Sequence, residues 1–125
     1  MRLLSAWVVG LSVVLLTAVL LHNVCDLFYD CGCTWLWAGG DAHCNIHEAN
    51  GPHCPWCANG LGGLVTVLGL TTLAEMLGAW GPRRPFWARL VGSVFAGALT
   101  LLALGILFAL HDGYPTFLGF ALAGG

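Results

Sequence analysis

Three long apolar stretches dominate the sequence, and short polar segments separate them. The stretches cover residues of about 3–21, 61–80 and 90–110. None of them alternates apolar and polar positions in the way a membrane barrel strand does. Each is about as long as the roughly 20 residues with which a helix crosses the hydrocarbon core of a bilayer. Because only helices satisfy their own backbone polar groups in lipid, the pattern predicts three transmembrane helices.

The composition supports a protein that is embedded in a membrane. The chain of 125 residues is 58% hydrophobic and only 8% charged, whereas a soluble domain carries about 25% charged residues. So few charges cannot cover a water-facing surface, and we expect the lipid bilayer to be the main partner. The net charge of −2 argues against a nucleic-acid ligand. We therefore predict an all-α integral membrane protein that forms a single membrane domain over residues 1–125.

The arginines predict how the three helices are oriented. Arg2 precedes the first helix, and the other three arginines lie in the segment 81–89, between the second and third helices. Short loops rich in arginine stay in the cytoplasm, so we expect the N-terminus and this inner loop to be inside. The outer loop 22–60 and the apolar C-terminal segment 113–125 then face the extracytoplasmic side of a bacterial plasma membrane, in an N-in/C-out topology.

Two features of the apolar stretches leave alternatives open. Residues 1–24 can also be interpreted as a secretory signal, although the apolar run is longer than usual and no small-residue cleavage site follows it. Glu75 is an acid inside the second predicted span. A buried acid in a membrane suggests a functional group, but Glu75 can equally extend toward the neighbouring arginines at the membrane surface.

The outer loop concentrates residues that bind metals. Six cysteines and four of the five histidines lie in it, and His111 follows the third helix at the same membrane level. Zinc and copper favour thiolate and imidazole ligands. Two pairs of ligands are four residues apart, so each pair shares one face if its segment is helical. The predicted metal ligands are His22, Asp26, His43, His47 and His111, together with Cys25, Cys31, Cys33 and Cys44.

Cys54 and Cys57 form a C-x-x-C pair that suggests a redox function. Pro55 between them is typical of the first turn of a helix. At a helix N-terminus the macrodipole lowers the pKa of a thiol, which favours thiol–disulfide exchange. A third interpretation is structural, because an even number of cysteines on an oxidising side can pair into disulfides that pin the loop.

The leading hypothesis is that the chain binds copper or zinc at the outer face of the membrane. A chain this short has little room for a substrate pocket. We therefore expect a metal-handling protein, or an accessory subunit of a larger membrane complex or homo-oligomer. The alternatives are a membrane thiol–disulfide oxidoreductase that uses Cys54 and Cys57, and a structural subunit with a disulfide-pinned loop.

Overall fold

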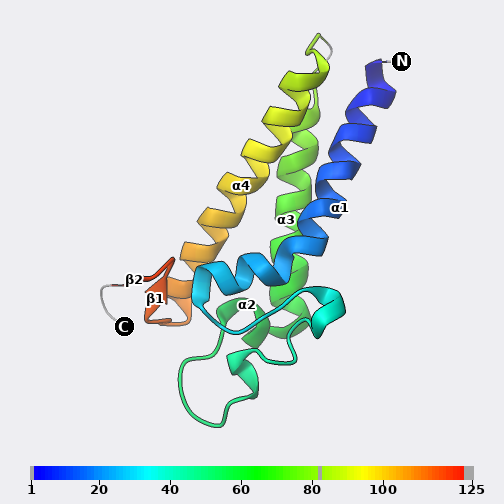
Figure 1. The fold of residues 1–125 in the computed structure, drawn as a ribbon. Coiled ribbons are helices and arrows are strands. Elements are labelled where there is room, and N and C mark those ends of the chain that lie inside the picture. Colours follow the sequence, from blue (N-terminus) through cyan, green and yellow to red (C-terminus); the bar gives the residue numbers. More distant parts are fainter. Residues whose placement is uncertain (1, 82, 123–125) are drawn as a thin grey trace.

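The computed structural model describes residues 2–81 and 83–122 of the chain. Within these ranges the protein is mostly helical, and three helices are long and apolar enough to cross a membrane. They are α1 (Arg2–Tyr29), α3 (Gly60–Ala79) and α4 (Phe86–His111), and each packs against the other two (Figure 1). The prediction of a mostly helical chain with three helices of membrane-spanning length is therefore confirmed.

Short elements gather at one end of this bundle. Between α1 and α3 lie two 3-10 turns, η1 (Leu36–Ala38) and η2 (Asn45–His47), and the one-turn helix α2 (Pro55–Ala58). After α4, β1 (Thr116–Phe117) pairs in antiparallel fashion with β2 (Phe120–Ala121). Figure 1 shows these elements below the long helices, whereas the start of α1 and the α3–α4 connection lie at the top. The cysteine-rich loop and the arginine-bearing connection are therefore at opposite ends.

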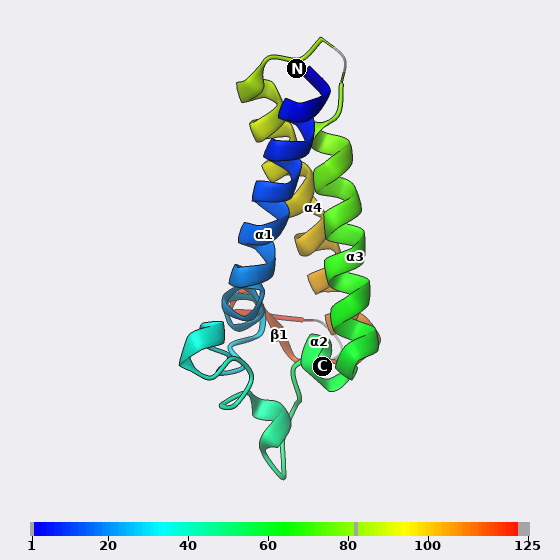
Figure 2. The same cartoon turned by 90° about the vertical axis from the view of Figure 1, so that its right-hand side faces the viewer.

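Helix α1 continues past the predicted end of its apolar stretch at residue 21. It adds about two turns and ends at Tyr29. In Figure 1 these added turns bend aside and run across the end of the bundle, and in Figure 2 they are seen end-on. The extension places Cys25 on a helix and buries it in the core at this end of the molecule.

Small residues bring α3 and α4 into close contact. Gly78 and Gly92 face each other, and a methyl group added at either one would collide with the backbone of the other. Further along the interface, Gly97 leaves room for the side chain of Glu75. Helices in lipid are held together by packing of this kind, because burial away from water supplies little of the driving force there.

Among the described residues, one acidic and one basic side chain are buried inside the bundle. Glu75 is 2% exposed, and its carboxylate accepts a hydrogen bond from Thr17 of α1. Arg89 is 3% exposed and donates hydrogen bonds to the carbonyl oxygens of Ala79 at 3.1 Å and Gly81 at 2.8 Å. Ala79 is the last residue of α3 and Gly81 lies two residues beyond it, at the helix end where acceptors are left unpaired and a positive charge is favourable. Glu75 therefore ties α3 to α1, and Arg89 caps α3.

Candidate metal centre

All six cysteines of the chain are buried together at the loop end of the bundle. Each is exposed by 9% or less, and none of them is in a disulfide within the described residues. They come from α1, from the segment that follows it, from the position before η2, and from the start and body of α2. In chain order they are Cys25, Cys31, Cys33, Cys44, Cys54 and Cys57.

The sulfur atoms are close enough to share metal ions. The Sγ of Cys25 lies 2.8 Å from that of Cys54 and 3.6 Å from that of Cys31. The cysteines can be divided into groups of three in which every Sγ is within 4.8 Å of the other two, and four such groups together contain each cysteine twice. The groups are Cys25–Cys31–Cys54, Cys25–Cys33–Cys57, Cys31–Cys33–Cys44 and Cys44–Cys54–Cys57. A metal with three thiolates at about 2.3 Å holds its sulfurs about 4 Å apart, so each group has the size of a metal site.

A sharp turn after α1 returns the chain to Cys25. The side chain of Asp26 accepts a hydrogen bond of 2.7 Å from the backbone N–H of Gly32. Gly32 has a φ of +85°, a conformation that glycine adopts at no steric cost. A methyl group at this position would also collide with the carbonyl oxygen of His43. The turn thus holds the two cysteines on either side of Gly32 against the cluster, and Asp26 serves it as a structural residue.

Asn45 ties together the segments that carry the cysteines. Its Oδ1 accepts a hydrogen bond of 2.6 Å from the backbone N–H of Cys54, and its own N–H donates to the carbonyl of Cys31 at 2.8 Å. Its Nδ2 donates to the hydroxyl of Tyr114 at 2.9 Å. Asn45 is not recognisable from the sequence, because no motif distinguishes an asparagine that bridges loop segments from one that faces water.

Burial and neighbouring sulfurs both shift the pKa values of the thiols in the cluster, and the net direction differs from one cysteine to another. The pKa of Cys44 is raised to about 11 because burial disfavours its thiolate form. The pKa of Cys57 is lowered instead, because neighbouring thiols, first that of Cys25, can donate hydrogen bonds to its sulfur. Six thiolates in one buried space would repel one another, so the complete set needs cations to compensate its charge.

An aromatic layer packs against the cysteines in the same buried core. Tyr29 is central: its ring centroid lies 5.6 Å from that of Trp56 and 5.3 Å from that of Tyr114. Its hydroxyl donates to the carbonyl of Gly105 at 2.8 Å, and Tyr114 donates in turn to the carbonyl of Tyr29 at 2.7 Å. These contacts anchor the cluster to α4 and exclude water from it, which strengthens every electrostatic interaction inside.

The tryptophans of the loop are divided between the core and the surface. Trp56 is fully buried, although a tryptophan close to the end of a membrane span commonly lies at the lipid interface. Trp35 and Trp37 are exposed and stack on each other with ring centroids 5.1 Å apart. Sequence alone does not separate these cases, because tryptophan is common in both settings.

The predicted histidine ligands lie outside the four groups of three cysteines. His22 is half-buried on α1, and His43 and His47 are exposed in the loop. Across the described residues, no histidine, aspartate or glutamate belongs to a group of metal-binding size with the cysteines. The structure thus brings together Cys25, Cys31, Cys33 and Cys44 of the predicted ligand set, joined by Cys54 and Cys57; the remaining predicted ligands stay a prediction.

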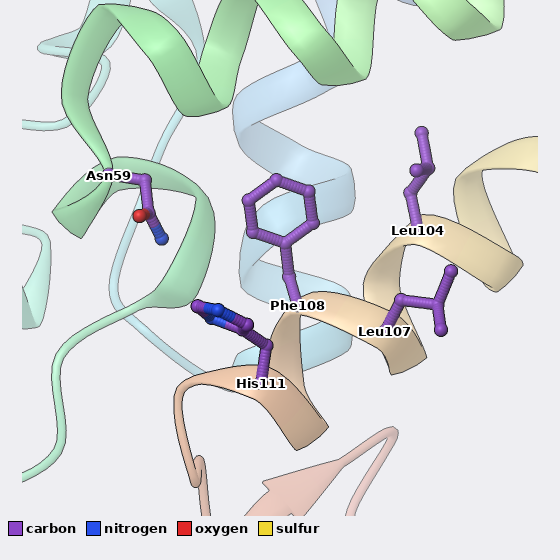
Figure 3. Close-up of a pocket in the computed structure, with 5 residues that line it drawn as sticks. All are labelled: Asn59, Leu104, Leu107, Phe108 and His111. Atoms are coloured by element: carbon purple, nitrogen blue, oxygen red, sulfur yellow. The ribbon is translucent and has the colours of Figure 1, made fainter.

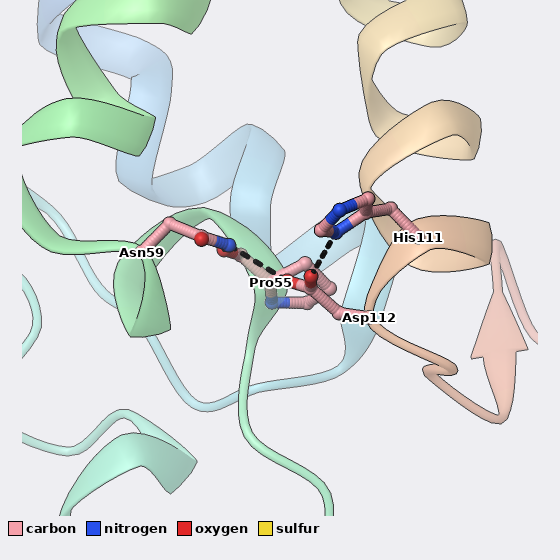
Figure 4. A network of polar contacts seen from close by, with 4 residues as sticks. All are labelled: Pro55, Asn59, His111 and Asp112. Atoms are coloured by element: carbon pink, nitrogen blue, oxygen red, sulfur yellow. Dashed lines mark hydrogen bonds and ion pairs between the residues drawn. The ribbon is translucent and has the colours of Figure 1, made fainter.

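His111 takes part in a separate polar network at the end of α4. Its Nδ1 lies 2.6 Å from Oδ1 of Asp112, whose other oxygen accepts a 2.7 Å hydrogen bond from Asn59 (Figure 4). Asn59 also donates to the carbonyl of Pro55 at 2.7 Å. The network therefore joins α4 to α2. A shallow pocket beside it is lined by Asn59, Leu104, Leu107, Phe108 and His111 (Figure 3).

No protein-family model, curated protein or solved structure matches this chain. The geometry nevertheless defines a candidate site: six buried cysteines, close enough to bind a metal, lie at one end of three helices of membrane-spanning length. The chemistry of the sulfur atoms therefore carries the functional interpretation.

Replacing Asn45 should loosen the cluster. Asn45→Ala removes the hydrogen bonds to Cys54 and Tyr114, each worth about 1 kcal/mol, and a longer one from the Sγ of Cys44. Local opening of the loop should therefore become at least about tenfold more frequent. Alkylation of the reduced, metal-free protein in detergent would measure this opening. Asn50→Ala, at an exposed loop position, is the matched control. Equal alkylation rates in the two variants would contradict the assigned role.

Proposed function

We propose that this chain is a metal-handling membrane protein that binds copper or zinc through its cysteine cluster. The observation that carries the proposal is the burial of all six cysteines in overlapping groups of three, each with the dimensions of a sulfur-ligated metal site. Thiolates select soft metals such as copper(I) and zinc over hard ions such as magnesium and calcium. A bound cation also removes the cost of burying thiolate charge.

In this proposal the cysteines are the final ligands of the metal. The predicted histidines bind the ion first and pass it on to the cysteines. His43 and His47 are exposed on either side of Cys44 and η2. Imidazole binds copper and zinc, so these side chains suit the first capture of an ion from water. The ion then passes inward to the thiolates, which bind soft ions more strongly. His111 is exposed, His22 and Asp26 are half-buried, and we propose these three as further ligands that accompany this step.

We further propose that the cluster faces the extracytoplasmic side of a plasma membrane. The arginines of the α3–α4 connection lie at the opposite end of the bundle (Figure 1). Arginine-rich connections of this length stay in the cytoplasm. With three spans in a single membrane domain, the loop between α1 and α3 is then exposed outside the cell, where it meets ions before they cross the membrane.

A thiol–disulfide oxidoreductase is the second candidate. It is favoured by the C-x-x-C pair at α2, where Pro55 occupies the first helical position. Two observations weigh against it. Helix α2 is only 4 residues long, so its dipole is small, and Cys54 is 0% exposed. The nearest sulfur to Cys54 at 2.8 Å is that of Cys25, whereas disulfide exchange requires that a partner thiol can reach the pair.

Protein purified in detergent under anaerobic, reducing conditions should contain copper or zinc by elemental analysis. Cys25→Ser combined with Cys54→Ser disrupts three of the four groups. It should lower the affinity for the metal by at least about tenfold, since even indirect partners of a metal site change affinity that much. The matched control is His43→Ala combined with His47→Ala. This variant should bind the same amount of metal at equilibrium but should take it up more slowly.

Two results would contradict the metal proposal. Metal-free protein that exchanges disulfides with a thiol substrate would support the oxidoreductase instead. Protein in which all cysteines resist alkylation until a reductant is added would support a disulfide-pinned structural loop.

The sidedness of the loop is tested by cysteine labelling. In a cysteine-free variant, Ala49→Cys adds a thiol to the exposed loop and Ala88→Cys adds one near the arginines. An impermeant thiol reagent applied to intact cells should label the first variant, and should label the second only after the membrane is permeabilised. The opposite pattern, or labelling of both thiols in intact cells, would overturn the proposed orientation.

A further inference from the structure

The four groups of three cysteines are connected in a regular way. Any two groups have one cysteine in common, and each cysteine belongs to two groups. No Sγ–Sγ pair therefore occurs twice, so four triangles of three edges account for twelve of the fifteen possible pairs. The pairs left over are Cys25 with Cys44, Cys31 with Cys57, and Cys33 with Cys54. Six points that each have four near neighbours and one opposite partner form an octahedron, and the four triangles are alternating faces of it. The remaining four faces are bounded by the same twelve pairs. Ions on two neighbouring faces would share two sulfurs and repel each other at very short range, so four alternating faces are the most that can be filled together.

We propose that this octahedron of sulfurs holds four copper(I) ions, one over each of the four alternating faces. Each ion then has three thiolate ligands, and each cysteine bridges two ions. The metals form a tetrahedron, and the six sulfurs lie along its edges. This inference rests on the proposed function and specifies the metal, its oxidation state and the number of ions. No coordination position stays open for a substrate, so the site suits storage or transfer of copper rather than catalysis.

The number of ligands selects copper(I) over zinc. Zinc in structural sites takes four ligands in a tetrahedron. The described cysteines offer groups of three, and no fourth thiol, imidazole or carboxylate joins any of them within 4.8 Å. Copper(I) is a soft ion that thiolates favour, and it is stable with three sulfur ligands. Three-sulfur faces therefore match copper(I), whereas they leave zinc one ligand short.

The charge of the site selects four ions over two. Two ions on opposite faces would also use all six sulfurs, but six thiolates with two copper(I) ions leave a net charge of −4. Four ions reduce this to −2, and a smaller buried charge costs less. The positive charge that a two-ion site lacks cannot come from the arginines at 83, 84 and 89, since they lie at the other end of the bundle (Figure 1). Bridging thiolates are therefore the favoured arrangement.

The observed distances show which contact must change when metal binds. Sulfurs on one three-coordinate ion are about 4 Å apart for bonds of about 2.3 Å. The Cys25–Cys31 and Cys33–Cys57 distances of 3.6 and 3.9 Å are already close to this value. Cys25 and Cys54, at 2.8 Å, must move apart. Loading thus requires the short Cys25–Cys54 contact to open, while the other two contacts are already near the spacing that a bound ion needs.

An anaerobic titration of the reduced protein with copper(I), in competition with a chromophoric copper(I) chelator, tests the proposal. Binding should saturate at four ions per chain, with the visible luminescence that water-shielded copper(I)–thiolate clusters emit. Because each cysteine serves two faces, Cys44→Ser and Cys57→Ser should each bind only two ions and lose most of the emission. His53→Ala, which changes an exposed residue beside the cluster, should still bind four.

The possible failures of this inference and of the proposed function are distinguishable. Saturation at one or two copper ions without luminescence, or preferential binding of zinc, would overturn the four-ion cage and leave metal binding intact. Absence of both copper and zinc binding would overturn both. If the serine variants do not fold, the copper stoichiometry and the emission of the unaltered protein still show whether the four-ion cage forms.

Discussion

The burial of six thiols in one water-poor space is the constraint on which this end of the molecule depends. A thiol is tolerated there in its neutral form, and burial raises the pKa of Cys44 to about 11. A set of thiolates is tolerated only when cations compensate its charge. Metal binding therefore displaces protons, and the free energy of binding adds to the free energy of folding. The loop is expected to be most stable when it is loaded.

The surrounding elements can be understood as the means of holding these sulfurs together. The added turns of α1 carry Cys25 across the end of the bundle, and the turn at Gly32 reverses the chain toward it. Asn45 fastens the returning segment to the start of α2 and to Tyr114. The three long helices provide the platform, because the packing of α1, α3 and α4 against one another fixes where the two ends of the loop and the C-terminal hairpin meet.

The apolar stretches were sufficient to predict three helices, because membrane-spanning length is a local property of the sequence. The site was predicted only in part. Cysteine and histidine content pointed to a metal, but helical spacing drew attention to His43 and His47, which lie on the exposed η2 region instead of a regular helix. The C-x-x-C pair suggested a separate function for Cys54, yet the fold places it beside Cys25, 29 positions away in the chain. Such long-range contacts depend on turns and side-chain hydrogen bonds that local spacing does not encode.

Whether sulfur or imidazole binds the metal also determines whether the protein retains its ions or exchanges them readily. A cluster closed by bridging thiolates holds several ions out of contact with water, whereas a histidine site at the surface would exchange ions readily. X-ray absorption at the copper edge of the loaded protein in detergent measures this difference directly. The account predicts a first shell of three sulfurs per copper, together with a short copper–copper distance. Nitrogen or oxygen in the first shell, or the absence of a neighbouring copper, would contradict it.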